Sequence, residues 1–216
     1  MIKLTAFRSL PPFAQGLARD FRVRWALEEA RIPYEEVLIG PEDRASAAYR
    51  ALQPFGLIPA IEEDELKLFE SGAIVLYIAE RSEALAPSDA HGLARTRAWM
   101  FAALNSVEPA VQNLGALDLF HAGEAWAAER RPTAVAAVQK RLSELEDWLG
   151  GRDYLEDRFT AGDLLMTTVL RIPRHTDIVT ERPMLKAYLE RCEARPAFKK
   201  AIADHLKPFE TQAARA

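Results

Sequence analysis

Apolar residues first alternate and then repeat at helical spacing along the first thirty residues of the chain, and a short apolar run follows. The alternation from Ile2 to Phe7 predicts a strand with one buried face. Apolar side chains recur every three or four positions from Phe21 to Arg31, which predicts a helix with a core-facing stripe. Glu35 to Ile39 then predicts a second strand. A strand, a helix and a strand in this order favour a right-handed βαβ unit.

A second group of elements follows within the next forty residues. Pro41 to Leu52 is polar and rich in alanine, so we expect a short helix or an irregular loop there. Two short strands are expected near Pro59–Ile61 and Leu66–Phe69, on either side of an acidic turn. An apolar stretch from Gly72 to Glu80 predicts a closing helix. The first part of the chain is therefore expected to be an α/β domain spanning residues 1–81.

The pattern changes character after residue 81. Residues 82–90 lack periodicity and contain Pro87, which is typical of a linker. Residues 91–216 contain no convincing strand, and helical stripes dominate; one of them is expected to stop at Pro109. The stripe from Val135 to Leu149 is the most regular in the chain. The second domain is therefore expected to be all helical.

A helix start is expected at Thr160 in the second half of the chain. Thr160 is a good N-cap residue, and Asp163 stands three positions later, where its side chain can bond back to the cap. Gly162 lies between them and makes the first helical turn costlier. We expect a structural capping box here, without a chemical role.

Composition removes several classes of function. The net charge is −4, so no overall positive field favours nucleic acid or an anionic membrane as a partner. No window is long and apolar enough for a membrane span, and the first residues lack a targeting segment, so a cytoplasmic protein is expected. Cys192 is the single cysteine, which excludes an intrachain disulfide, and its helical face predicts a buried thiol. The four histidines lack ligand spacing, so no metal site is expected.

The stretch from Gln53 to Glu80 carries the most specific chemistry in the sequence. Ile58-Pro59 is a peptide bond that can be cis at modest cost, at the entrance of an expected strand. A cis bond there would leave the Ile58 backbone groups free to pair with an extended peptide. Glu70 and Ser71 stand where a helix begins; Ser71 is expected at the N-cap, and free N–H groups there attract a carboxylate. Glu70 suits an ammonium group, so the stretch favours the amino-acid end of a small peptide.

The segments FGLIPAI and LFESGAIVLYIAE resemble the glutathione-binding core of glutathione transferases. YLEDRFTAGD and ERPMLKAYLERCEARPAFKKAI resemble the same family's C-terminal domain, so the resemblance covers the whole chain. It implies a thioredoxin-like α/β N-terminal domain followed by an all-α helical domain. It also implies glutathione as co-substrate and a homodimeric assembly.

The resemblance assigns roles to particular residues. Ile58 would pair its backbone with the cysteinyl unit of glutathione, and the peptide bond to Pro59 would be cis. Glu70 and Ser71 would hold the γ-glutamyl ammonium and carboxylate groups. Gln53 lines the same loop and is a weaker candidate for a direct contact.

The residue that activates the glutathione thiol is harder to place. Family members usually carry a Tyr, Ser or Cys between the first strand and the first helix. Aligning this chain on the strand puts Ser9 there, whereas aligning it on FRVRWALEEA puts Ala18 to Asp20 there and makes Arg19 the second candidate. Backbone N–H groups at the start of the helix are a third possible source of activation. Arg44 suits the glycyl carboxylate chemically, but no motif fixes its position, so an exposed arginine without a partner is expected.

Conjugation of the glutathione thiolate to a small hydrophobic electrophile is the function that the resemblance implies first. Two alternatives stay open because the segment from Ser9 to Asp20 departs from the family pattern. One is a glutathione-transferase-like binding or regulatory module without catalysis. The other is a glutathione-dependent reductase or isomerase on the same scaffold.

Overall fold

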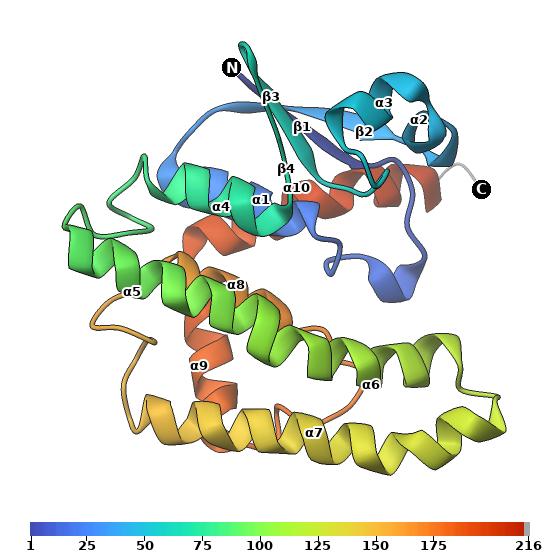
Figure 1. Ribbon diagram of the computed structural model, residues 1–216, viewed down its shortest axis with the longest axis vertical. Helices are drawn as coiled ribbons and strands as arrows, with labels where there is room; N and C mark the ends of the chain where they lie inside the picture. The colour runs from blue at the N-terminus through green and yellow to red at the C-terminus, as the bar shows by residue number, and fades with distance from the viewer. Residues whose placement is uncertain (214–216) are drawn as a thin grey trace. The chain divides into compact units, whose positions relative to one another are not determined.

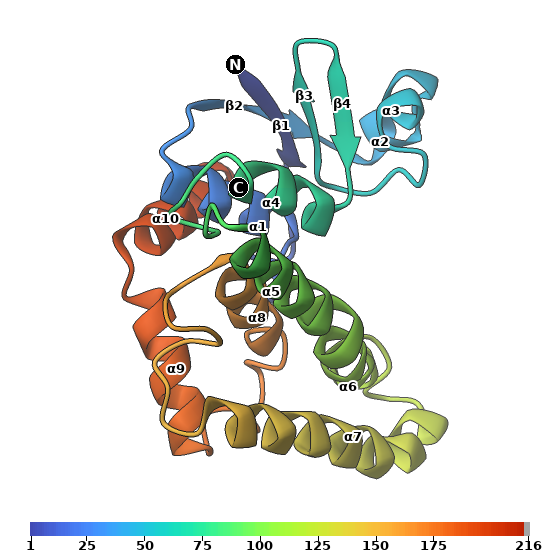
Figure 2. The same cartoon turned by 60° about the vertical axis from the view of Figure 1, so that its left-hand side comes forward.

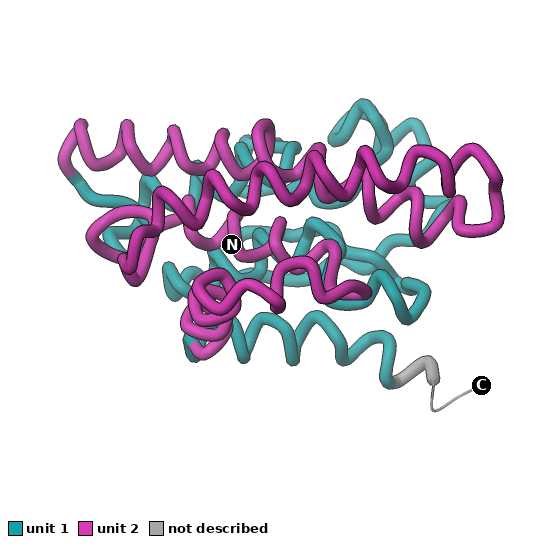
Figure 3. The backbone as a smooth tube through the Cα atoms, turned by 90° about the horizontal axis from the view of Figure 1, so that it is seen from below, with its two compact units in different colours: residues 1–88, 195–216 teal, residues 89–194 magenta. Residues whose placement is uncertain are grey.

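A computed structural model describes residues 1–213, and the contacts within it divide the chain into two compact units. Unit 1 contains residues 1–88 together with the segment from Arg195 onward, and unit 2 contains residues 89–194. Figure 3 colours them separately, and the C-terminal helix carries the colour of unit 1. The sequence predicts a first domain of residues 1–81, a linker of residues 82–90 and a second domain of residues 91–216, and these boundaries stay a prediction. In the structure, the C-terminal helix packs with the first unit.

Unit 1 is built on a four-stranded sheet in the order β2-β1-β3-β4 (Figure 1). β1 (Ile2–Phe7) pairs in parallel with β2 (Tyr34–Ile39). β3 (Ala60–Glu63) pairs antiparallel with both β1 and β4 (Leu66–Phe69). The predicted βαβ unit and the two later strands are confirmed, and the sheet with its helices has the thioredoxin-like arrangement.

Helices cover this sheet. α1 (Asp20–Ala30) and α4 (Ser71–Ala79) lie together on one face, and α10 (Pro196–Ala213) packs beside α1 (Figures 1 and 2). The segment that was expected to be a short helix or a loop forms two short helices, α2 (Pro41–Ala45) and α3 (Ala47–Leu52). A 3₁₀ turn, η1 (Pro12–Ala14), lies between β1 and α1.

Aromatic contacts explain why α10 belongs to unit 1. The ring of Phe198 lies edge-on to Phe21 and Trp25 of α1, with centroids 5.4 and 4.9 Å away. Phe21 and Trp25 are fully buried, and such pairs stabilise packing beyond their buried area. Glu29 of α1 also accepts two hydrogen bonds from Arg195, at 2.6 and 2.7 Å. The C-terminal helix is therefore part of the core around α1.

All regular elements of unit 2 are helices, as predicted (Figures 1 and 2). Every residue of its central helix α8 is buried. Its elements in chain order are α5 (Ala90–Phe101), a π-helical turn (Ala102–Val107), α6 (Glu108–Phe120), α7 (Ala125–Leu149), α8 (Ala161–Leu170) and α9 (Pro183–Glu193).

The expected stop at Pro109 is wrong. Pro109 lies in the first turn of α6, and the helical path continues through the π-helical turn Ala102–Val107. A proline in the first turn needs no N–H, but in a regular helix its ring would press on the carbonyl of Asn105. The wider turn before it relieves that clash, so the chain bends its hydrogen-bond ladder instead of ending the helix.

The capping box at Thr160 is confirmed. The Thr160 hydroxyl accepts from Gly162 N–H at 3.2 Å, and Asp163 accepts from Thr160 N–H at 2.9 Å. The structure also gives a reason for Gly162, because a Cβ atom there would lie 2.6 Å from Cβ of Trp99 on α5. The glycine therefore permits a close approach of α8 to α5.

Candidate functional site

The loop between α3 and β3 contains the Ile58-Pro59 peptide bond, which is cis as predicted. Gln53 organises the start of this loop, since its side-chain oxygen accepts from Phe55 N–H at 2.7 Å. The Gln53 side chain is almost fully buried. Neither the N–H nor the C=O of Ile58 has a hydrogen-bond partner within residues 1–213. The loop thus presents one unpaired backbone edge of the kind that an extended peptide can bind.

Two buried hydroxyl groups hold this loop against the sheet. Thr5 Oγ1 accepts from Ala60 N–H at 2.8 Å and lies 3.1 Å from Ala60 C=O. The phenol of Tyr49 donates to Leu57 C=O at 2.6 Å and lies 3.2 Å from Thr5 Oγ1. Burial raises the pKa of Tyr49, so the phenol keeps the proton that it donates. Sequence reasoning missed this support, because residues 5, 49 and 57 share no local pattern.

Glu70 and Ser71 lie at the start of α4. The helix begins one residue earlier than predicted, so Ser71 is its first residue and not its N-cap. Glu70 takes the cap position with a φ of 69° and an exposed side chain, and its C=O accepts from Ile74 N–H at 2.9 Å. The Ser71 side chain is 5% exposed. This turn sets a carboxylate and a hydroxyl beside the unpaired N–H groups of a helix start.

Arg22 of α1 lies behind Ser71. Its Nη1 atom donates to Ser71 Oγ at 3.4 Å, and the arginine itself is buried. A guanidinium remains charged at all ordinary pH values, so it adds positive charge near the N-terminus of α4. The first turn of α1 and the Glu70-Ser71 turn are therefore neighbours. The spacing between residues 22 and 71 carries no sequence signal, and the sequence analysis did not find this contact.

The two candidates for thiol activation occupy different places. Ser9 is exposed at the end of β1, beside Arg8, which pairs with Glu42 and Asp43 of α2. Arg19 is partly buried and directly precedes α1, so the alignment on the helix brings Arg19 to the helix start. The backbone N–H groups of Ala18 and Asp20 have no acceptor among the described residues.

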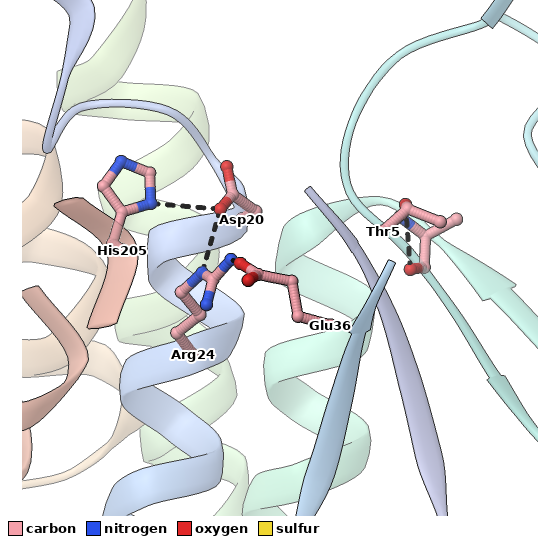
Figure 4. Close-up of polar contacts among 6 residues, drawn as sticks. Thr5, Asp20, Arg24, Glu36 and His205 are labelled. Carbon is pink, nitrogen blue, oxygen red and sulfur yellow. Dashed lines mark hydrogen bonds and ion pairs between the residues drawn. The ribbon is translucent and has the colours of Figure 1, made fainter. Parts of the chain in front are cut away.

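A buried charged cluster lies behind the start of α1 (Figure 4). Asp20 Oδ2 lies 3.1 Å from Arg24 Nε and 3.1 Å from His205 Nδ1, and Arg24 also pairs with Glu36 of β2. Burial by itself raises the pKa of Asp20, but the hydrogen bond and charge of His205 and the charge of Arg24 outweigh burial and hold it below its usual value. A carboxylate only accepts, so His205 Nδ1 carries the proton.

Three other expectations concern single residues or groups. Arg44 is half-buried, not solvated, and its guanidinium lies over the Phe7 ring, 5.5 Å from the centroid. Its Nε atom is buried and lacks a hydrogen-bond partner within the described chain. Cys192 is buried, as predicted. Within residues 1–213 we find no group of three or more metal-ligating side chains, and no helix long and apolar enough to cross a bilayer.

Comparisons with known proteins agree with this geometry. The model of the glutathione S-transferase N-terminal domain matches residues 21–86, and that of the C-terminal domain matches residues 119–196. Glutathione S-transferase 3 of Zea mays is 33% identical over 84% of this chain and 87% of its own length. The chain belongs to the glutathione S-transferase family. It is also similar to maleylacetoacetate isomerase of Rhizobium meliloti, with 31% identity over 88% of this chain and 93% of that protein.

A solved transferase structure shows the same fold. The glutathione transferase of Burkholderia graminis, with two glutathione molecules bound per subunit, superposes with a TM-score of 0.80. It is 26% identical over 93% of this chain and 87% of that one. The family assignment and the fold expected from the sequence are both confirmed.

Proposed function

We propose that this glutathione transferase family member binds glutathione along the Ile58-Pro59 loop and conjugates its thiolate to a small hydrophobic electrophile. The observation that carries the proposal is the joint placement of an unpaired Ile58 backbone edge and the Glu70-Ser71 turn at the start of α4. An extended γ-glutamyl peptide needs both features, because one pairs its backbone and the other its charged amino-acid end.

Each part of the peptide has a proposed partner. The Ile58 N–H and C=O pair with the cysteinyl unit, and Pro59 shapes the loop beside it. Ser71 and the free N–H groups of α4 hold the γ-glutamyl carboxylate, while Glu70 accepts from the ammonium. Arg44 is proposed for the glycyl carboxylate, since its buried Nε atom lacks a partner within the described chain. Gln53 acts through the loop, because its amide oxygen already accepts from Phe55 N–H.

The reaction requires the glutathione thiol to lose its proton. The sulfur then forms a bond to an electrophilic carbon of the acceptor. In a substitution, the leaving group departs with the electron pair of the broken bond; in an addition, that pair stays on the acceptor and takes up a proton. A positive charge or N–H donors near the sulfur favour the thiolate. Arg19 and the N–H groups of Ala18 and Asp20 are the proposed stabilisers at the start of α1. Ser9 is the second candidate, because its exposed hydroxyl lies at the end of β1.

Affinity measurements test the binding site. Glu70→Ala and Ser71→Ala should each weaken glutathione binding by about 1.5–3 kcal/mol, which is roughly a 10- to 150-fold rise in Kd, because each removes a charge-assisted hydrogen bond. Calorimetry with folded variants measures this. Glu65→Ala is the matched control, because it removes an exposed carboxylate from the β3–β4 turn. Unchanged affinity in both site variants would remove Glu70 and Ser71 from the site.

One observation keeps a second candidate function open. The described start of α1 presents Leu17, Ala18 and Arg19 and no hydroxyl or thiol side chain. A module that binds glutathione without activating it fits this feature, and so does an isomerase of the kind named among the relatives. Conjugation assays with halide electrophiles, alongside disulfide and cis-alkene substrates, separate the three. Homodimer formation, a cytoplasmic location and a role in detoxification are proposed with the transferase function.

A further inference from the structure

The first residue of α1 carries a buried negative charge. The Asp20 side chain is fully buried and sits in the first turn of the helix, where a carboxylate offsets the partial positive charge of the unpaired N–H groups. This is the same partial charge that would favour a thiolate at the helix start. An unscreened Asp20 would therefore oppose ionisation of a thiol bound there.

Two side chains restrain that charge. Arg24 lies one turn further along α1 and donates to Asp20 Oδ2 at 3.1 Å. His205 reaches the same oxygen at 3.1 Å from α10, a segment 185 residues away in sequence. The His205 ring is itself fixed, because Phe21 and Phe209 lie edge-on to it with centroids 5.8 and 5.4 Å away. The position and the effective charge of the Asp20 carboxylate thus depend on the C-terminal helix (Figure 4).

The first turn of α1 is coupled to the proposed peptide site. Arg22, two residues after Asp20, donates to Ser71 Oγ at the start of α4. A displacement of the first turn of α1 therefore reaches the residue that is proposed to hold the γ-glutamyl carboxylate. The Asp20 side chain bonds to Arg24 of α1 and His205 of α10, so Asp20 acts on the site through charge and helix position and not by contact.

We propose that Asp20 and His205 are positioning residues that control how readily glutathione ionises at the start of α1. The inference rests on the proposed glutathione-binding function and adds a control element from the C-terminal helix. The hydrogen bond to His205 fixes the carboxylate toward α10 and disperses part of its negative charge. Through His205, α10 therefore contributes to the electrostatic potential at the thiol of bound glutathione as well as to the packing of the core.

The other charged groups around the pair are already engaged. On α1, Arg24 is shared between Asp20 and Glu36, and Glu36 is the carboxylate that β2 contributes. On α10, Asp204 is paired with two lysines of the same helix. The lysines are Lys200, which also pairs with Glu28 of α1, and Lys207. His205 is therefore the group through which α10 acts on Asp20.

An ultraviolet titration of the thiolate in the glutathione complex tests the proposal. Asp20→Asn removes the opposing charge and should lower the pKa of bound glutathione by roughly 0.5–1 unit. His205→Leu removes the donor and should raise that pKa by a similar amount, since Arg24 alone then screens the carboxylate. His205→Gln retains an N–H donor and should return the pKa toward the wild-type value. His91→Leu, at an exposed position of α5, is the matched control and should not change it.

The opposite signs distinguish charge control from simple loss of structure. A purely structural role would change the thiol pKa in the same direction for Asp20→Asn and His205→Leu, or leave it unchanged, and either result overturns the proposal. If Asp20→Asn does not fold, the rise in His205→Leu and its reversal in His205→Gln decide the question. Calorimetry on the wild type comes first, because absence of glutathione binding refutes the proposed function. If the wild type binds glutathione but the Asp20 and His205 variants leave the pKa of the bound thiol unchanged, this inference alone is refuted.

Discussion

Replacing Gly162 with alanine sets two known effects against each other. Helix propensity favours alanine over glycine by about 1 kcal/mol in a helix interior, so propensity alone predicts a more stable protein. The packing of α8 against α5 predicts the reverse. A Cβ atom at position 162 would lie 2.6 Å from Cβ of Trp99, far inside ordinary carbon–carbon contact.

The clash cannot be relieved by a rotamer change. The atom in the way is Cβ of Trp99, which is attached directly to the backbone of α5. The Trp99 ring is also held, because its Nε1 atom donates to Glu156 at 3.0 Å and its ring lies 5.1 Å from that of Trp148. The two helices must therefore separate. Overpacking of this kind costs about 1–3 kcal/mol, and the propensity gain is smaller in a first turn, so a net loss of ~1–2 kcal/mol is expected.

Urea and thermal unfolding measure this loss. For a protein of this size, 1 kcal/mol corresponds to roughly 2–4 °C in Tm, so Gly162→Ala should unfold about 2–8 °C below the wild type. Gly123→Ala is the matched control, because a Cβ atom there meets no atom within 4 Å. It should leave the Tm unchanged or slightly raised. A Gly162→Ala variant that is more stable than the wild type would refute the close approach of α8 to α5.

Two further predictions concern the cap of α8 and the start of α1. Thr160→Ala should lower the free energy of unfolding by ~0.5–2 kcal/mol, because it removes the acceptor for Gly162 N–H, and it should leave glutathione affinity unchanged. Chemical denaturation and calorimetry check both parts, and lost binding in a folded variant would contradict a structural role. Arg19→Ala should raise the pKa of bound glutathione by about one unit, whereas Ser9→Ala should not change it. The reverse outcome in a thiolate titration would assign the activation to Ser9.

Local patterns predicted most of the fold, since strand alternation and helical stripes depend on neighbouring residues. β1, α1 and β2 lie within a residue or two of their predicted bounds, and the capping box of Thr160 and Asp163 has the predicted geometry. The continuation of the helix through Pro109 was missed, because the proline predicts a stop and the π-helical turn that precedes it has no local sequence signal. The grouping of α10 with unit 1 has no local signal in the sequence, since it depends on aromatic contacts across most of the chain.

The candidate site divides in the same way. The Ile58-Pro59 bond and the Glu70-Ser71 turn stand in short, contiguous motifs, so the sequence indicates them. The supporting residues do not, because Tyr49 and Arg22 reach the site from α3 and α1, and His205 reaches Asp20 behind it from α10. A short motif therefore indicates which groups of the protein can bind a peptide, whereas the charge and rigidity of those groups depend on long-range contacts. The thiol chemistry depends on the second kind, which is why the motif alone left three ways to activate glutathione. The proposed activation of the bound thiol therefore depends on the charged pair Asp20–His205 behind α1 as well as on the groups at the start of that helix.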